Sequence, residues 1–167
     1  MKYEQVKHQI GDGDLVALKR ADAWFWRLVS WVTSSPYTHT AIAVRIGTGA
    51  FVVELHWSGP RIVPLLSYRH PFDVFRCPVS QETVRRAAFE FAAKRIRYDW
   101  LDLFRIGLFN LFRLKPSADE GGLVCSSFNA RIYRHAGWQP PPKFPRIPSP
   151  AAMVRAMKSK PILEVIP

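Results

Sequence analysis

Two strand-like segments joined by a glycine turn limit the folds open to this chain more than any other feature. Residues 38–46 alternate between two sets of side chains, as they do in a β-strand whose successive residues point to opposite faces of a sheet. One set is His39, Ala41, Ala43 and Arg45, and the other is Thr40, Ile42, Val44 and Ile46. The tripeptide Gly-Thr-Gly then leads into the apolar residues 50–56, so the pattern predicts a β-hairpin.

The remaining strand and helix patterns surround this hairpin. Short apolar segments bounded by turn residues predict further strands at residues 15–18, 61–65, 72–76 and 162–166, and hence a mainly antiparallel sheet. Helical spacing predicts helices at residues 22–32, 80–96, 100–114 and 123–135. We expect Ser80 to cap one helix and Gly137 to end another. Residues 139–148 hold five prolines and predict an irregular strap, after which Ser149-Pro150 opens a short helix.

Length and charge narrow the class of protein. With 167 residues, 48% of them hydrophobic, we expect residues 1–167 to form one domain. The 24 Lys and Arg against 13 Asp and Glu give a net charge of +11, which favours polyanionic surroundings such as anionic lipid, cell-wall polymer or nucleic acid. Nucleic acid is the least favoured, because the basic residues form no run and no nucleic-acid motif is found. For residues 100–114, core packing is favoured over an interfacial helix that docks on lipid.

The cysteines and the N-terminus bear on the compartment. Cys77 and Cys125 are the two cysteines, too few for a disulfide scaffold, and we expect free thiols. The first eight residues lack the apolar core of a signal peptide, and no apolar run reaches membrane-spanning length. We therefore expect a soluble protein made in the cytosol, with action at the cell envelope left open.

Cys125 is the leading candidate for a nucleophile. It lies in Gly-Gly-Leu-Val-Cys-Ser-Ser-Phe-Asn, at the start of a predicted helix. A helix N-terminus and a nearby imidazole both lower the pKa of a thiol and so favour the reactive thiolate. Without such surroundings, a cysteine in this apolar context is a small buried hydrophobe. The double glycine and the helix start favour catalysis, and Cys77 is assigned a structural role.

His39 and Glu54 are the predicted partners of Cys125. His39 opens a strand stiff enough to aim an imidazole, and His56 is the alternative base. Glu54 interrupts an apolar strand, so its burial requires a partner. A histidine on the adjacent strand would complete a Cys-His-Glu triad. The alternative is a structural ion pair of Glu54 with Arg45 or Arg61.

Five short motifs, in this order, resemble those of the permuted NlpC-type, papain-like cysteine amidases and peptidases, in particular the YiiX/YaeF branch. They are Gly13-Asp14-Leu15-Val16, Tyr37-Thr38-His39-Thr40-Ala41-Ile42, Val52-Val53-Glu54, Arg97-Tyr98-Asp99-Trp100 and Val124-Cys125-Ser126-Ser127. Each motif is weak by itself, and the specificity lies in their order. The resemblance implies a circularly permuted α+β fold, with an antiparallel sheet packed against the nucleophile helix.

The resemblance also implies an activity and a site. It predicts a hydrolase that cleaves an amide or peptide bond, with a cell-wall stem peptide as one candidate, through Cys125, His39 and Glu54. Tyr37, Ser126 and Tyr98 are expected at the oxyanion or the substrate, although core packing is the alternative for the two tyrosines. No metal or organic cofactor is implied.

The chain also departs from the family pattern. Many relatives carry a glutamate shortly after the Cys-Ser pair, where this chain has Ser127 and Phe128, and the Asn-Cys-Glu-His motif of related lipid acyltransferases is absent. Acyl transfer or ester hydrolysis on lipid is therefore the second hypothesis. A non-catalytic binding module on the same fold is the third.

Overall fold

A six-stranded antiparallel sheet forms the centre of the protein. The computed structural model describes residues 2–19, 35–96, 124–157 and 160–166. The strands are β1 Leu15–Leu18, β2 His39–Ile46, β3 Gly49–His56, β4 Gly59–Pro64, β5 Phe72–Phe75 and β6 Leu163–Val165. Their order in the sheet is β4-β3-β2-β1-β5-β6, and every pair of neighbours is antiparallel. The predicted antiparallel sheet is confirmed.

The β2–β3 hairpin forms as the alternation predicts. Its ladder runs from Ile46 opposite Gly49 to Ile42 opposite Val53. Gly47, in the turn, has a φ of 57°, in the left-handed region that side chains disfavour. The ladder ends before it reaches His39, which pairs instead with Leu18 of β1. The start of β2 is thus held from one side by β1.

Helices flank the sheet, and their ends differ in detail from the expectations. They are α1 Tyr3–Val6, α3 Gln81–Ala92, α5 Cys125–His135 and α6 Pro150–Ala156, with 3-10 turns at Lys7–Gln9 and Leu65–Ser67. Ser80 holds the N-cap position of α3, but its side chain accepts no capping bond there. The Ser149 side chain does cap α6, accepting from Ala152 N at 3.2 Å, and Pro150 begins the helix as predicted.

Other boundaries were predicted incorrectly. Helix α3 stops at Ala92 rather than residue 96, and α5 starts at Cys125 rather than residue 123. Leu65 belongs to a 3-10 turn rather than to a strand, because the chain leaves β4 at Pro64, and α1 was not foreseen. The helices expected at residues 22–32 and 100–114 lie outside the described residues.

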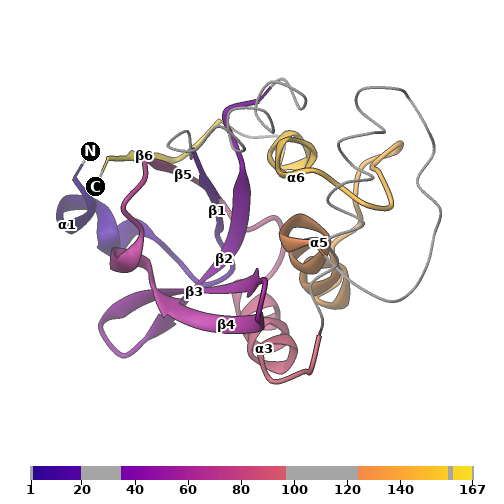
Figure 1. Ribbon diagram of the computed structural model, residues 1–167, viewed down its shortest axis with the longest axis horizontal. Coiled ribbons are helices and arrows are strands. Elements are labelled where there is room, and N and C mark those ends of the chain that lie inside the picture. The colour runs from indigo at the N-terminus through magenta and orange to yellow at the C-terminus, as the bar shows by residue number, and fades with distance from the viewer. Residues whose placement is uncertain (1, 20–34, 97–123, 158–159, 167) are drawn as a thin grey trace.

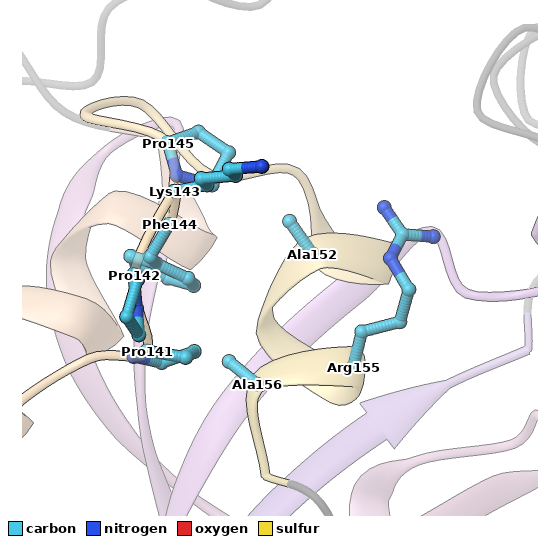
Figure 2. Close-up of a pocket in the computed structure, with 8 residues that line it drawn as sticks. All are labelled: Pro141, Pro142, Lys143, Phe144, Pro145, Ala152, Arg155 and Ala156. Carbon is cyan, nitrogen blue, oxygen red and sulfur yellow. The ribbon is translucent and has the colours of Figure 1, made fainter.

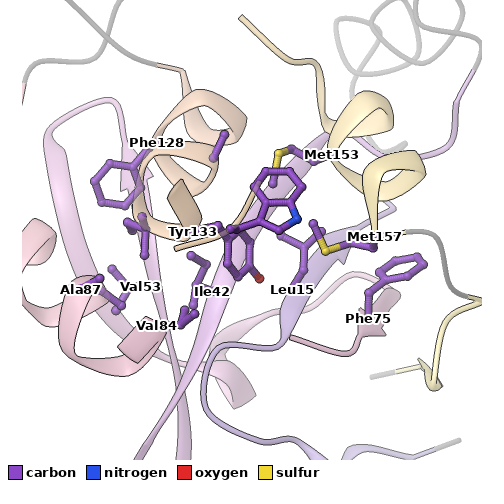
Figure 3. Close-up of a cluster of buried hydrophobic side chains, with 14 of the residues drawn as sticks. Leu15, Ile42, Val53, Phe75, Val84, Ala87, Phe128, Tyr133, Met153 and Met157 are labelled. Atoms are coloured by element: carbon purple, nitrogen blue, oxygen red, sulfur yellow. The ribbon is translucent and has the colours of Figure 1, made fainter. Parts of the chain in front are cut away.

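The two faces of the sheet carry two separate apolar cores. On one face Leu15, Ile42 and Val53 pack with Phe128 and Tyr133 of α5, which Figure 3 shows side by side. On the other face lies a second cluster with different members of the same strands, Val16, Ala41, Ala43 and Val52. In Figure 1, α5 and α6 lie on one side of the sheet and α1 on the other, near both termini. The predicted alternation in β2 is confirmed.

The Gly13-Asp14 motif serves the fold. Gly13 has a φ of 78°, and a Cβ there would lie 2.8 Å from the Cys77 sulfur. The fully buried Asp14 carboxylate accepts the backbone N–H groups of Gly11 and Cys77, both at 2.9 Å, and pairs with Arg76 at 3.0 Å. It thereby fixes the loop before β1 to the end of β5. This motif stabilises the end of the sheet away from His39.

The proline-rich strap packs beside α6. Trp138 and Phe144 meet edge to face with ring centroids 5.3 Å apart, and Lys143 adopts a left-handed φ of 69°. Between the strap and α6 lies a surface cavity of about 250 Å³, lined by Pro141, Phe144, Ala152 and other residues shown in Figure 2. The strap is ordered but irregular, as the prolines predict.

No helix among the described residues is both long and apolar enough to cross a membrane.

Candidate active site

Cys125 is the first residue of α5, and its side chain lies at the junction of that helix with the sheet. The residue is 5% exposed. Its N-cap, Val124, has an extended backbone, and within the described part of the chain no side chain caps this helix. The first N–H groups of a helix lack intrahelical acceptors, and together with the helix dipole they favour a negative charge. The thiol therefore lies where a thiolate is stabilised.

His39, at the start of β2, lies between Cys125 and Glu54. Its Nε2 is 2.7 Å from Glu54 Oε2, and the imidazole also hydrogen-bonds to the Cys125 side chain. Burial by itself would lower the pKa of His39, but the adjacent Cys125 and Glu54 outweigh burial and raise that pKa to about 10. The ring is therefore a cation at neutral pH, next to the ionised carboxylate of Glu54.

The pKa of Cys125 moves in the opposite direction. Burial opposes ionisation of the thiol, but the His39 imidazolium, aided by the backbone N–H groups of Thr40 and Ser126, lowers the pKa below its ordinary value. Cys125 and His39 thus each favour the charged form of the other. Two elements supply the backbone donors, β2 through Thr40 and α5 through Ser126.

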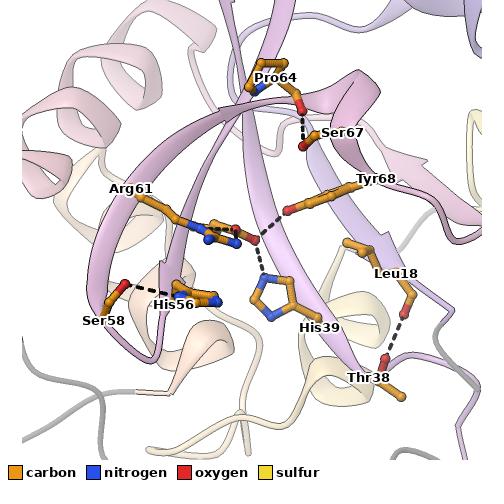
Figure 4. Close-up of polar contacts among 10 residues, drawn as sticks. Leu18, Thr38, His39, His56, Ser58, Arg61, Pro64, Ser67 and Tyr68 are labelled. Carbon is orange, nitrogen blue, oxygen red and sulfur yellow. Dashed lines mark hydrogen bonds and ion pairs between the residues drawn. The ribbon is translucent and has the colours of Figure 1, made fainter. Parts of the chain in front are cut away.

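Glu54 is held by three partners at once. Arg61 approaches Oε1 through Nε at 2.7 Å, and the Tyr68 hydroxyl donates to Oε2 at 2.5 Å, the oxygen that His39 also contacts. In Figure 4 the side chains of His39, Arg61 and Tyr68 point toward one another, and their dashed contacts converge. Glu54 is 2% exposed, and although burial would raise its pKa, the hydrogen bonds from His39, Tyr68 and Arg61 lower that pKa to about 2. The carboxylate stays ionised and fixed.

Two pairings of Glu54 that the sequence left as alternatives therefore exist together. Glu54 binds the predicted histidine, His39, and also Arg61, on the neighbouring strand β4. Arg45, the other candidate, donates instead to the carbonyl oxygens of Lys7 and Thr48. Arg61 contacts Oε1 of the carboxylate, whereas His39 contacts Oε2 and lies between Glu54 and Cys125.

His56 lies close to the triad without joining it. It interacts electrostatically with Glu54 and His39, and its Nδ1 is 3.1 Å from Ser58 Oγ. Burial and the nearby Arg61 lower the pKa of His56, so its ring is neutral at physiological pH. His39, rather than His56, is the histidine that links Cys125 to Glu54.

Three further residues were expected near the oxyanion or the substrate. The Tyr37 hydroxyl donates to Asp73 at 2.5 Å, so its only proton is already committed. The fully buried Ser126 hydroxyl donates to the Pro148 carbonyl at 2.5 Å and ties α5 to the strap. Both hydroxyls thus bind structural partners. Ser126 contacts the Cys125 thiol through its backbone N–H. Tyr98 lies outside the described residues.

Tyr68 is the member of the site that sequence reasoning missed. It follows the 3-10 turn Leu65–Ser67, and its hydroxyl reaches Glu54 on β3. A tyrosine in a turn carries no local signal of such a long-range contact. The only available hint was the buried carboxylate, which has more lone pairs than one histidine can satisfy.

Cys77, by contrast, has no such surroundings. Both cysteines are free thiols, as expected. Burial raises the pKa of Cys77 to about 11, and its Sγ contacts the Val79 carbonyl at 3.2 Å. The structure agrees with a structural role for this residue.

Comparisons with known proteins bear on the fold. No family model matches the chain, and neither does any curated protein sequence. A solved structure, metalloprotein YiiX from Escherichia coli O157:H7, superposes with a TM-score of 0.68 over 95% of this chain and 99% of that one, at 18% identity. The chain has a YiiX-like fold. At this identity the likeness shows the α+β architecture, and the activity has to be argued from the site.

Proposed function

We propose that this protein is a cysteine hydrolase on a circularly permuted papain-like fold. Cys125 is the nucleophile, His39 the general base and Glu54 the residue that orients His39. The observation that carries the proposal is the continuous chain of contacts from the Cys125 thiol through His39 to Glu54, with the pKa of the thiol lowered and that of the imidazole raised. Activated cysteine nucleophiles have this charge pattern.

The reaction follows from the pair of charges. The Cys125 thiolate attacks the carbonyl carbon of an amide, and the electron pair of the C=O bond moves to oxygen. As the intermediate collapses, His39 donates its proton to the leaving nitrogen, leaving a thioacyl-enzyme. His39, now neutral, takes a proton from water, whose oxygen displaces the thiolate and releases the acid. Glu54 keeps the imidazole oriented throughout.

The start of α5 supplies the donors for the oxyanion. The backbone N–H of Cys125 lies at the helix N-terminus, where no side chain among the described residues competes for it. Such preorganised donors stabilise the charge that develops on a carbonyl oxygen. Tyr37, which was expected to assist, has its hydroxyl on Asp73 and is omitted from this mechanism.

The substrate is proposed from the family resemblance and from charge. We assign an amide or peptide bond, with the stem peptide of a cell-wall polymer as the first candidate, since a net charge of +11 favours an anionic polymer. An ester or acylated lipid is the second candidate. The neighbour YiiX is described as a metalloprotein. Among the described residues of this chain no group of three or more His, Cys, Asp or Glu side chains is placed to hold a metal ion, so no step is assigned to one.

An acyl probe that traps a thioester tests the proposal. Mass spectrometry after incubation with an activity-based acyl probe should find the adduct on Cys125, and Cys125→Ala should abolish it. The control is Cys77→Ala, which should label like the parent protein. Cell-wall fragments, acyl esters and model lipids, compared in parallel, then distinguish the substrate classes. Absence of a Cys125 adduct with every probe would leave a binding module as the explanation of the fold.

A further inference from the structure

An exposed tryptophan lies at the tip of the β3–β4 hairpin. His56 pairs with Gly59 across the hairpin, so the tip consists of Trp57 and Ser58. Trp57 is 64% exposed, whereas tryptophan side chains are highly buried on average. The two strands hold this tip in place through six paired positions. The indole is therefore presented to solvent from a fixed support.

The tip is adjacent to the proposed catalytic residues. The rings of Trp57 and His56 have centroids 5.1 Å apart and are tilted by 47°. His56 in turn interacts electrostatically with both Glu54 and His39. His56 thus lies beside the exposed indole and within electrostatic range of the base that serves Cys125.

His56 adds polar recognition to this apolar surface. Ser58 holds Nδ1 at 3.1 Å, which fixes the orientation of the ring. Within the described part of the chain Nε2 of His56 has no hydrogen-bond partner. A neutral imidazole nitrogen can donate or accept, depending on the tautomer. An indole face beside a polar group suits a ring with polar substituents, and it suits a bare hydrocarbon chain less well.

We propose that Trp57 and His56 form a recognition subsite for a six-membered ring attached next to the bond that Cys125 attacks. The ring stacks on the indole, and a polar substituent binds His56. A hexose and an aromatic ring share this chemistry, because each offers a flat face to the indole and can carry a hydrogen-bonding group. The subsite rests on the proposed role of Cys125 as the nucleophile.

Alkylation of Cys125 measures the subsite without knowledge of the natural substrate. Three reagents are compared: bromoacetamide, N-phenyl-bromoacetamide and N-bromoacetyl-glucosamine. Each second-order rate constant is divided by that for free cysteine, so that intrinsic reactivity cancels. In the parent protein at least one ring-bearing reagent should react faster than bromoacetamide by about 2- to 10-fold, the range expected for one stacking contact.

The variants assign that preference to the tip. Trp57→Ala should reduce the ratio of ring-bearing to plain reagent toward one, and Trp57→Phe should keep part of it. The matched control is Leu66→Ala, because Leu66 is equally exposed at 64% on a turn elsewhere, and it should preserve the ratio. His56→Leu should lower the glucosamine arm more than the phenyl arm, since the hexose depends on the polar contact.

The possible failures are distinguishable. If bromoacetamide modifies Cys125 no faster than Cys77, the proposed function itself is wrong. If Cys125 is reactive but the parent protein shows a ratio of one with both rings, or if Trp57→Ala keeps the preference, the subsite is refuted. A preference for phenyl alone identifies an aromatic substituent, and a preference for the glucosamine arm identifies a sugar.

Discussion

The two cysteines of this protein lie in surroundings that share most of their parts. Near Cys77, the buried carboxylate of Asp14 pairs with Arg76 and accepts the Cys77 backbone N–H. Near Cys125, the buried carboxylate of Glu54 pairs with Arg61. Each end of the sheet thus combines a thiol, a carboxylate and an arginine.

The imidazole makes the difference. At Cys77 burial dominates and the Asp14 charge adds to it, so the pKa of the thiol rises to about 11. At Cys125 His39 lies between thiol and carboxylate, and the pKa of the thiol falls despite equal or greater burial. A buried carboxylate with its arginine stabilises the fold at Cys77, and we infer that it helps to activate a thiol only where a histidine lies between the two, as at Cys125.

Competitive alkylation tests this contrast with the largest expected effect. A thiol with a pKa of about 11 is about one ten-thousandth ionised at pH 7, whereas a thiol at the ordinary value of 9.0 is about one hundredth ionised, and the pKa of Cys125 lies below that value. Iodoacetamide at limiting concentration should therefore modify Cys125 at least about 100-fold faster than Cys77, even after allowing for the lower nucleophilicity of a less basic thiolate. Peptide mapping by mass spectrometry gives the ratio, and equal labelling of the two thiols would remove the contrast.

Removing the carboxylate charge beside His39 should produce the next largest effect. Glu54→Gln leaves Arg61 and the His39 cation without their anion, and should cost about 3 kcal/mol of unfolding free energy. Because the folded pKa of Glu54 is about 2, its contribution is present above the ordinary pKa near 4.5 and is lost as pH falls toward 2. The free energy of unfolding in urea should therefore fall less between pH 7 and pH 3 in the variant than in the parent protein.

The control for Glu54→Gln is Glu90→Gln. Glu90 also pairs with a histidine, His135, at 3.2 Å, but both side chains are about half exposed. Exposed pairs contribute about 0 to 1 kcal/mol, so this variant should unfold nearly like the parent. A large loss in Glu90→Gln would show that burial does not set the difference.

Replacing the imidazole should make Cys125 resemble Cys77. In His39→Asn the thiol loses its cation, so alkylation of Cys125 at pH 6 should slow by about 10-fold or more and recover as pH rises through the ordinary thiol range. The raised pKa of His39, about 10, also gives stability that is fully present below pH 6.5 and is lost as pH rises through 10. A pH–rate profile of alkylation from pH 5 to 10 measures the first effect, and an unchanged profile contradicts the role of His39.

The smallest effect concerns two tyrosines with matched geometry. Tyr68 donates to Glu54 and Tyr37 to Asp73, both at 2.5 Å. Each Tyr→Phe variant should lose about 1 to 2 kcal/mol of stability, measured by thermal or urea unfolding. Only Tyr68→Phe should also change the alkylation rate of Cys125, by a few-fold, because only Tyr68 binds the carboxylate that orients His39. Equal changes in both variants would indicate a general loss of rigidity.

Local patterns predicted the parts of the molecule that local forces determine. The alternation in β2, the glycine turn and the Ser149-Pro150 helix start follow from backbone and burial preferences over a few residues, and these predictions are confirmed. The meeting of His39 with Glu54 could be expected because the two lie on consecutive strands. Contacts between distant segments left no local trace: Tyr68 with Glu54, Tyr37 with Asp73, and Ser126 with the Pro148 carbonyl. Each of these contacts depends on how the turns and the strap pack against the rest of the structure.

The separation of Cys125 from its partners along the chain bears on how the molecule folds. One continuous stretch of the chain supplies His39, Glu54, Arg61 and Tyr68. Cys125 belongs to α5, which lies much later in the sequence and packs on the same sheet. Contacts between such distant segments form slowly, because a long loop must close first. The thiol therefore acquires its low pKa only when α5 docks, and pulsed alkylation during refolding reports that single event. Strands β1 to β5 can pair beforehand without a reactive cysteine.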